Sequence, residues 1–294
     1  MSGSTLASRV LGRQLQKFRE RAGLSQNVMA RAAETSPQTY GRLEDGVKHN
    51  VPSMMINALC DRLRVSDSER RFLLSLGEEV RHVHKFGGKW WRADIDEISS
   101  EFDHYMCLHD SARRLTTWSL NLVPGLLQTA GYRREIAWAE NPLWTPEQVD
   151  HCLSLMTRRQ ERLTDSSFEV EAILSEMILR QMIGSTSVMA DQLLHLVELG
   201  DRPNVTIRVA PFGVANAIGP VAGSFVWMDF SQLPSTKLQE PPAVYVEEYV
   251  GRLYLERREE IAPYRDALTR IRRIALNTDE TRNLILAIAR EYSE

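Results

Sequence analysis

The sequence predicts two domains of different class: an all-α domain of five helices over residues 8–82 and an α/β or α+β domain over residues 94–294, joined by a linker over residues 83–93. The first observation is size, because 294 residues with 43% hydrophobic content suffice for about two domains with buried cores. The second is periodicity, since apolar residues recur at helical spacing near the N-terminus, whereas helical and β-prone segments are mixed further along. The third is charge: residues 1–86 carry 14 Lys and Arg against 9 Asp and Glu, a net charge of +5, and the remainder carries −8.

The composition predicts a cytoplasmic, nucleoid-associated protein. Cys60, Cys107 and Cys152 are odd in number and far apart, which argues against a disulfide framework and for a reducing compartment. The sequence contains no run of about 18 apolar residues, so no membrane span is expected. The first residues lack the pattern of a secretory signal. A mildly basic head on an acidic body is typical of a nucleic-acid-binding domain joined to a regulatory domain.

Start and stop signals divide the N-terminal region into helices. Gly23 ends the first helix, and Ser25 can cap the second. Ser36 is an N-cap followed by Pro37 at the first helical position of the third helix. Further along, Ser66 and Glu69 form a capping box for the fifth helix. The five helices are expected over residues 10–22, 26–33, 37–45, 51–65 and 66–80.

The second and third helices form a predicted helix-turn-helix unit, in which the second helix of the unit lies in the major groove. A Gln side chain can pair with adenine and an Arg side chain with guanine, so the polar third helix suits base recognition. Gly41 allows close approach of the backbone to DNA, and Gln26 is placed to contact a phosphate. An ordinary solvated helix face would show the same pattern. The predicted DNA-binding residues are Gln26, Ser36, Gln38, Thr39, Arg42 and Lys48.

This region resembles the Xre/Cro/lambda-repressor helix-turn-helix family, which implies a lambda-repressor-like fold and DNA binding. The sequence departs from the family pattern at Glu34, where a turn glycine is common, and at Gly41, where a small hydroxyl residue is usual. A non-glycine residue in a left-handed turn costs on the order of 1 kcal/mol. The matching residues are Leu15, Arg19, Gly23, Leu24, Ser25, Gln26, Ala30, Ser36, Thr39, Arg42, Glu44 and Gly46.

The remaining chain mixes helices and strands. Residues 145–163 form a helix capped by Thr145 and Gln148, and a Pro-Gly turn precedes another helix within residues 121–139. Further helices are expected over residues 96–114, 187–200, 256–275 and 278–292, and strands over residues 115–120, 168–174, 205–211, 224–230 and 243–249.

This body resembles the domain of unknown function that follows an Xre-type head in the actinomycete WhiJ-like group. Its most specific segment is "VPGLLQT" at residues 123–129. The resemblance implies an antitoxin-like regulator paired with a small acidic BldB-like protein. Among the other matching residues are Tyr132, Gln160, Glu176, Gly184, Gln192, Asn204, Phe212, Asp229 and Glu247.

Two interpretations of the "VPGLLQT" segment stay open. The apolar side chains beside its Pro-Gly turn either complete the domain core or form a surface that meets a partner. The candidate partner-binding residues are Val123, Leu126 and Leu127.

We expect no enzymatic activity, metal or cofactor. Nucleophile-elbow and phosphate-loop motifs are absent from the sequence. His104, Cys107 and His109 have poor spacing for a metal on one helix, so ordinary packing explains them better.

The sequence therefore predicts a sequence-specific DNA-binding transcriptional regulator whose C-terminal domain senses a small protein partner or a ligand. The alternative is an antitoxin-like interaction protein that mainly sequesters a small partner and autoregulates its operon. A homodimer on double-stranded DNA is expected, because one short helix reads few bases and paired half-sites add affinity.

Overall fold

The chain forms two compact units in a computed structural model. The first unit comprises residues 1–112 and 229–256, and the second comprises residues 113–228 and 257–294. The structure describes residues 5–48, 50–86, 104–215, 218–248 and 252–293.

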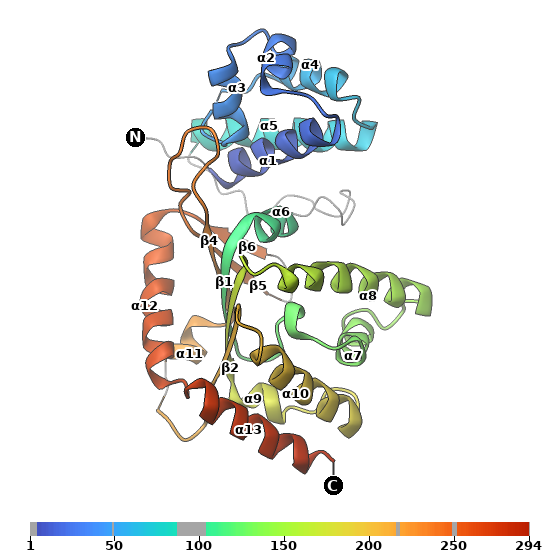
Figure 1. The fold of residues 1–294 in the computed structure, drawn as a ribbon, viewed down its shortest axis with the longest axis vertical. Helices are drawn as coiled ribbons and strands as arrows, with labels where there is room; N and C mark the ends of the chain where they lie inside the picture. The colour runs from blue at the N-terminus through green and yellow to red at the C-terminus, as the bar shows by residue number, and fades with distance from the viewer. Residues whose placement is uncertain (1–4, 49, 87–103, 216–217, 249–251, 294) are drawn as a thin grey trace. The chain divides into compact units, whose positions relative to one another are not determined.

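The first unit contains the five predicted N-terminal helices, followed by a sixth helix and a two-stranded hairpin (Figure 1). Strands β5 (Ala243–Glu247) and β6 (Arg252–Leu255) pair antiparallel. Helix α5 continues to Phe86, so the first residues of the predicted linker are helical; residues 87–93 lie outside the described residues. The helices are α1 (Leu6–Arg21), α2 (Gln26–Ala32), α3 (Pro37–Glu44), α4 (Ser53–Leu63), α5 (Asp67–Phe86) and α6 (His104–Ser111).

The predicted caps form as hydrogen bonds. Ser36 accepts from the N–H of Thr39 at 3.1 Å and begins α3. The backbone N–H of Ser66 donates to the Glu69 carboxylate at 2.7 Å, and the N–H of Glu69 donates back to the Ser66 hydroxyl at 3.3 Å. These bonds satisfy backbone donors that have no partner within a helix, which fixes where α3 and α5 begin.

Glycine allows α1 and α3 to pack backbone against backbone. A Cβ at Gly12 would lie 2.2 Å from the carbonyl oxygen of Glu44, so only glycine fits there. Gly46 has a φ of +68°, and a Cβ there would lie 2.6 Å from the Cα of Arg9. The Ser8 hydroxyl donates to the Gly46 carbonyl at 2.6 Å across the same contact. This contact holds the end of α3 directly on α1.

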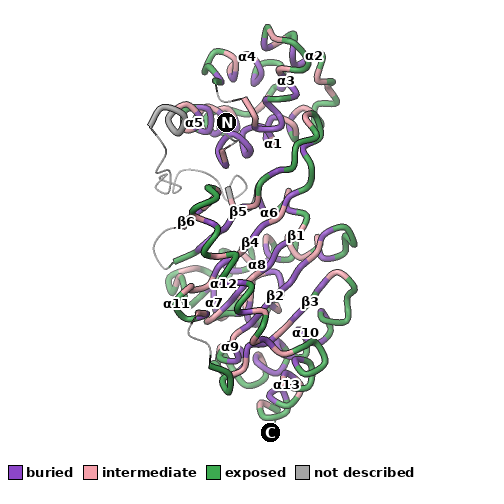
Figure 2. The backbone as a smooth tube through the Cα atoms, turned by 90° about the vertical axis from the view of Figure 1, so that its left-hand side faces the viewer, coloured by how far each residue is buried: buried purple, intermediate pink, exposed green. Residues whose placement is uncertain are grey.

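The second unit is built on four strands that lie side by side in the order β3-β2-β1-β4. Strand β2 pairs parallel with both β1 and β3. Figure 1 shows α11 and α12 on one side of the sheet and α7, α8 and α10 on the other. Coverage of both faces explains why the interior strand β2 is almost entirely buried (Figure 2). The strands are β1 (Ala112–Ser119), β2 (Glu169–Ser175), β3 (Val205–Ala210) and β4 (Phe225–Phe230).

The helices of the second unit follow the predicted order, with two short additions. Helices α9 and α11 have five residues each and are too short for helical periodicity to reveal. Strand β6, with four residues, was likewise not predicted. The helices are η3 (Gly125–Leu127), α7 (Ala130–Glu140), α8 (Pro146–Gln160), η4 (Glu161–Thr164), α9 (Glu176–Arg180), α10 (Thr186–Gly200), α11 (Ile218–Ala222), α12 (Arg258–Ile274) and α13 (Thr278–Glu291).

The predicted helix over residues 96–114 is wrong at its end. Helix α6 stops at Ser111, and β1 begins at Ala112. Residues Arg114 to Ser119 pair parallel with β2, and Leu115, Thr116, Trp118 and Ser119 are buried, so sheet formation overrides local helical preference. The part of the prediction before residue 104 lies outside the described residues.

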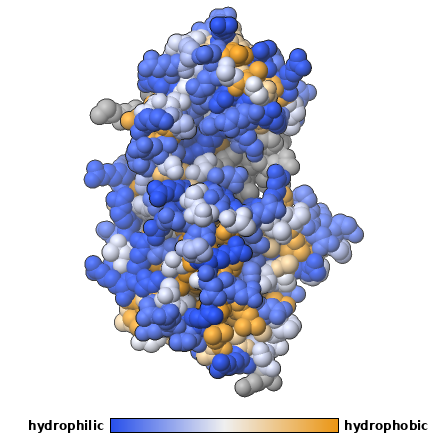
Figure 3. Space-filling view, viewed as in Figure 1, coloured by the Kyte–Doolittle hydropathy of each residue, from blue (hydrophilic) through white to orange (hydrophobic). Residues whose placement is uncertain are grey.

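Most of the surface visible in Figure 3 is hydrophilic, with apolar side chains gathered mainly in its lower part. Among the described residues, no helix is long and apolar enough to cross a membrane.

Three glutamines hold the "VPGLLQT" turn. The Gln160 amide donates to the carbonyl of Gln128 at 2.7 Å and also reaches the carbonyls of Gly125 and Leu126. Gln128 donates to the Val123 carbonyl at 2.7 Å. These bonds satisfy backbone groups that the irregular turn leaves without ladder partners.

Gln192 completes this arrangement from α10. Its amide donates to the Leu127 carbonyl at 2.8 Å, and its side-chain oxygen accepts from the Thr129 N–H at 2.7 Å. The side chain is fully buried. One side-chain amide thus satisfies a backbone acceptor and a backbone donor on either side of Gln128.

We predict that Gln192→Leu lowers the free energy of unfolding by about 2 kcal/mol, because a buried donor and a buried acceptor lose their partner. Urea unfolding followed by circular dichroism measures this. Gln181→Leu, at an exposed position after α9, is the matched control and should change stability by less than about 0.5 kcal/mol. Equal stability of the two variants would contradict the structural role of Gln192.

Candidate DNA-binding interface

Helix α3 presents one buried and one exposed face. Tyr40 and Leu43 are buried, with exposed fractions of 0% and 1%. Gln38 and Arg42 are exposed and lie four residues apart, on one side of the helix. The structure therefore brings together the two residues predicted to recognise bases.

The side chains of Ser36 and Thr39 form a hydrogen bond with each other at the start of α3. Their hydroxyl groups lie 2.8 Å apart, and the Ser36 hydroxyl also accepts from the Thr39 N–H. Ser36 is exposed and Thr39 is half-buried. The Ser36 side chain caps the helix, and the Thr39 hydroxyl is hydrogen-bonded to that cap.

Glu44 fixes the position of α3 against α1 and α2. Its carboxylate accepts from Arg19 Nε at 2.6 Å, from Arg19 Nη2 at 3.0 Å and from Gln26 Nε2 at 2.7 Å. Glu44 is 5% exposed. The hydrogen bond to Glu44 raises the pKa of Arg19, so the guanidinium stays charged. Gln26, predicted to contact a phosphate, also joins the start of α2 to the end of α3.

Lys48 follows α3 and is half-buried. Its ammonium lies 3.8 Å from the sulfur of Met55, and burial lowers the pKa of the Lys48 ammonium below its ordinary value.

The turn between α2 and α3 keeps the left-handed conformation that the family glycine would supply. Glu34 has a φ of +49°. Its N–H donates to the Arg31 carbonyl at 3.2 Å, and the N–H of Thr35 donates to the Ala30 carbonyl at 2.9 Å. The departure from glycine therefore leaves the turn in place at a cost in backbone strain.

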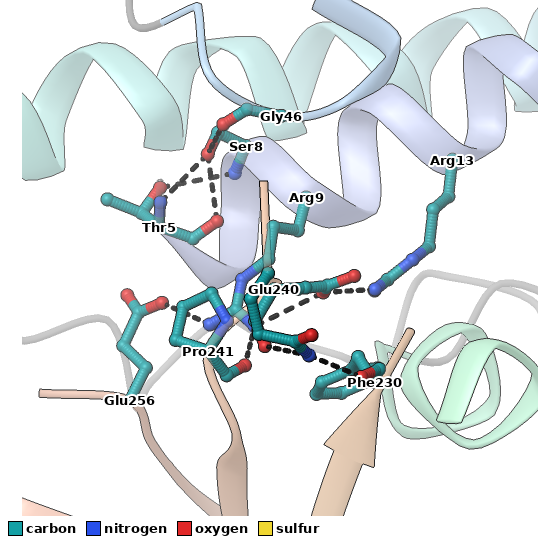
Figure 4. Close-up of polar contacts among 10 residues, drawn as sticks. Thr5, Ser8, Arg9, Arg13, Gly46, Phe230, Glu240, Pro241 and Glu256 are labelled. Atoms are coloured by element: carbon teal, nitrogen blue, oxygen red, sulfur yellow. Dashed lines mark hydrogen bonds and ion pairs between the residues drawn. The ribbon is translucent and has the colours of Figure 1, made fainter. Parts of the chain in front are cut away.

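A buried ionic cluster on α1, which the local sequence does not predict, is drawn in Figure 4. Arg9 is 2% exposed; its Nη1 donates to Glu240 at 3.2 Å and to the Pro241 carbonyl at 2.8 Å, and its Nη2 donates to Glu256 at 2.8 Å. Arg13 also pairs with Glu240. The two guanidinium carbons lie 5.6 and 4.9 Å from the centre of the Phe230 ring.

Arginines on a helix ordinarily face solvent, whereas the side chain of Arg13 is only 16% exposed beside Glu240. Local sequence carries no signal for this cluster, because the acidic partners are more than 220 residues away along the chain.

The candidate partner-binding residues lie in the core of the second unit. Val123, Leu126 and Leu127 are 2%, 6% and 0% exposed. Buried side chains offer little surface to a partner, which favours the core interpretation; partner contact by these residues stays an untested prediction.

Two family models match the chain. A helix-turn-helix domain matches residues 10–73, and a domain of unknown function, DUF5753, matches residues 102–287. No curated protein and no solved structure matches the chain.

We predict that Glu34→Gly raises the free energy of unfolding by up to about 1 kcal/mol, because glycine adopts positive φ without a steric penalty. Thermal unfolding measures the effect. Glu34→Ala keeps the Cβ and should show no such gain. A destabilised glycine variant would contradict strain at this turn.

Proposed function

We propose that this chain, which belongs to the DUF5753 family and carries a helix-turn-helix domain ahead of the family domain, is a sequence-specific transcriptional regulator. The helix-turn-helix domain makes it a DNA-binding regulator. The observation that supports sequence specificity is the exposed pair Gln38 and Arg42 on a capped helix whose opposite face is buried. Both side chains have the donors and length needed to reach base edges in the major groove.

We assign to the second unit the sensing of a small protein partner or ligand. Its sheet and covering helices form a rigid scaffold, and loops held by such scaffolds commonly carry binding sites. The BldB-like protein implied by the WhiJ-like resemblance is our candidate partner. Purification of the tagged chain from its host, with mass spectrometry of bound proteins and small molecules, tests this assignment. Recovery of the chain with neither would count against it.

We predict that Arg42→Ala and Gln38→Ala each weaken binding to a selected DNA duplex by about 1–3 kcal/mol and relax specificity at the contacted base. The duplex is obtained by selecting a random library with the full-length chain, and affinity is measured by fluorescence anisotropy. The effect should be absent on DNA of unrelated sequence, because base contacts discriminate between sequences.

Arg62→Ala is the matched control for this experiment. Arg62 is exposed on α4, and its removal changes the net charge as Arg42→Ala does. Equal losses for the two arginine variants on both duplexes would assign Arg42 to general electrostatic attraction.

We further propose a homodimer. A single α3 reads few bases, whereas two copies reading half-sites about 10 base pairs apart gain specificity and affinity. We expect selected duplexes to contain inverted repeats and analytical ultracentrifugation to show two chains per duplex. One chain on an undivided site would contradict the dimer.

A further inference from the structure

The connection between β4 and β5 forms a hairpin arm within the first unit. Gln232 and Gln239 make an antiparallel bridge, and the Leu233 N–H donates to the Leu238 carbonyl at 2.8 Å. The Lys237 N–H donates to the Leu233 carbonyl at 3.0 Å, and Lys237 has a φ of +59°. We call residues 233–238 the hairpin tip.

The hairpin tip contacts α3 directly. The Asp45 carboxylate accepts from the backbone N–H of Ser235 at 3.2 Å and from that of Thr236 at 2.6 Å. Asp45 is 3% exposed. Two successive N–H groups on one carboxylate give charge-assisted hydrogen bonds, which are stronger than neutral ones.

The hairpin tip also contacts the start of α2 and lies beside Gly41 of α3. Ser235 Oγ lies 3.3 Å from Gln26 Nε2. A Cβ on Gly41 would lie 3.1 Å from the Ser235 side chain. Gly41 is buried in this conformation, so its lack of a side chain makes room for the hairpin tip rather than for a DNA backbone. This differs from the role the sequence predicts for Gly41.

The hairpin tip and DNA require the same side of α3. Residues three, four and seven positions apart share one face of a helix, so Gly41, Arg42 and Asp45 lie on the face of Gln38. Gln38 and Arg42 are the predicted base-contacting residues, and Gln26 is the predicted phosphate contact. A duplex seated on this face would meet Ser235 and Thr236 before reaching Gln26 or Gly41.

The arm is held by buried ion pairs at its base and by hydrogen bonds at its tip. At the base, Glu240 and Glu256 pair with the buried guanidinium of Arg9. At the tip, Pro234, Ser235, Lys237 and Leu238 are exposed, and the contacts to α2 and α3 are hydrogen bonds. When the tip leaves, water can replace the hydrogen bonds to Asp45 and Gln26, so the tip can move while the ion pairs at the base stay in place.

We infer that the hairpin tip is an autoinhibitory element that covers part of the DNA-facing side of α2 and α3 and must move away before DNA binds. This inference rests on the proposed DNA-binding function. The observed conformation is then the closed state, and the apparent affinity for DNA falls in proportion to the fraction of molecules whose tip is open.

The decisive variant replaces residues 234–237 with Asn-Gly in the full-length chain. Asn-Gly forms a two-residue hairpin turn, so the Leu233–Leu238 pair can be kept while the Asp45 and Gln26 contacts are removed. We expect binding to the selected duplex to become roughly tenfold tighter, corresponding to a tip that is closed in about nine of ten wild-type molecules.

Lys237→Ala is the matched control. The replacement of residues 234–237 removes the positive charge of Lys237, which alone would weaken DNA binding. Lys237→Ala removes that charge but keeps the backbone N–H groups that contact Asp45, so it should not bind more tightly than wild type. Unchanged or weaker binding by the Asn-Gly variant would overturn the autoinhibitory role.

A cross-link tests the closed state directly. Gly41→Cys with Ser235→Cys places two Cβ atoms within a few tenths of an ångström of the roughly 3.5–4.5 Å that a disulfide spans. We expect the oxidised chain to lose at least tenfold in affinity relative to its own reduced form, and Ser235→Cys alone to show no such change. Equal binding by the oxidised and reduced forms would overturn the inference.

The outcome also separates this inference from the proposed function. If neither wild type nor the Asn-Gly variant selects any duplex from the library, DNA binding itself is refuted. If both select the same duplex and bind it equally, DNA binding stands and the inhibitory role of the hairpin tip is refuted.

Discussion

The geometry of the N-terminal helices depends on the hydrogen bonds that the Glu44 carboxylate accepts. Buried at the end of α3, it receives hydrogen bonds from Arg19 on α1 and Gln26 on α2, so one side chain ties three helices together. A buried carboxylate without partners would be costly, and these bonds satisfy both of its oxygens. Because α1 and the end of α3 also pack backbone against backbone at Gly12, α3 cannot shift without breaking both sets of contacts. The exposed face of α3 is therefore presented in a fixed orientation.

Adjacent acidic residues at the end of α3 bind different neighbours. Glu44 binds inward to α1 and α2, whereas Asp45 binds the backbone of the hairpin tip. Consecutive positions on a helix are about 100° apart, so two neighbouring side chains can bind the helical core and an outer segment at the same time. The rigidity supplied by Glu44 matters to this second contact, because a fixed α3 gives the hairpin tip a fixed surface to recognise. If α3 were mobile, DNA and the hairpin tip would both bind it less selectively.

The sequence predicts the helical head well because its signals are local. Caps at Ser36 and Ser66 and the stop at Gly46 mark helix boundaries within a few residues of the observed ones. The strands from β1 to β5 are predicted by short β-prone runs, whereas the four-residue β6 and the five-residue α9 and α11 are too short for any periodicity. The burial of Arg9 could not be predicted, since a helical arginine normally indicates a solvated face and its partners Glu240 and Glu256 lie 231 and 247 positions away. The same long separation hides the contact between Asp45 and the hairpin tip.

The ionic cluster on α1 changes how the charge of the head should be understood. The +5 charge of residues 1–86 includes Arg9 and Arg13, and both face Glu240 in the folded chain. A cation paired with a buried carboxylate does not release a counterion from DNA, so these two arginines add nothing to backbone attraction while the cluster is intact. Composition therefore overstates the electrostatic attraction of the head for DNA. With less general attraction, a larger share of the affinity has to come from directed contacts by α3, which makes access to that helix an effective point at which to control binding.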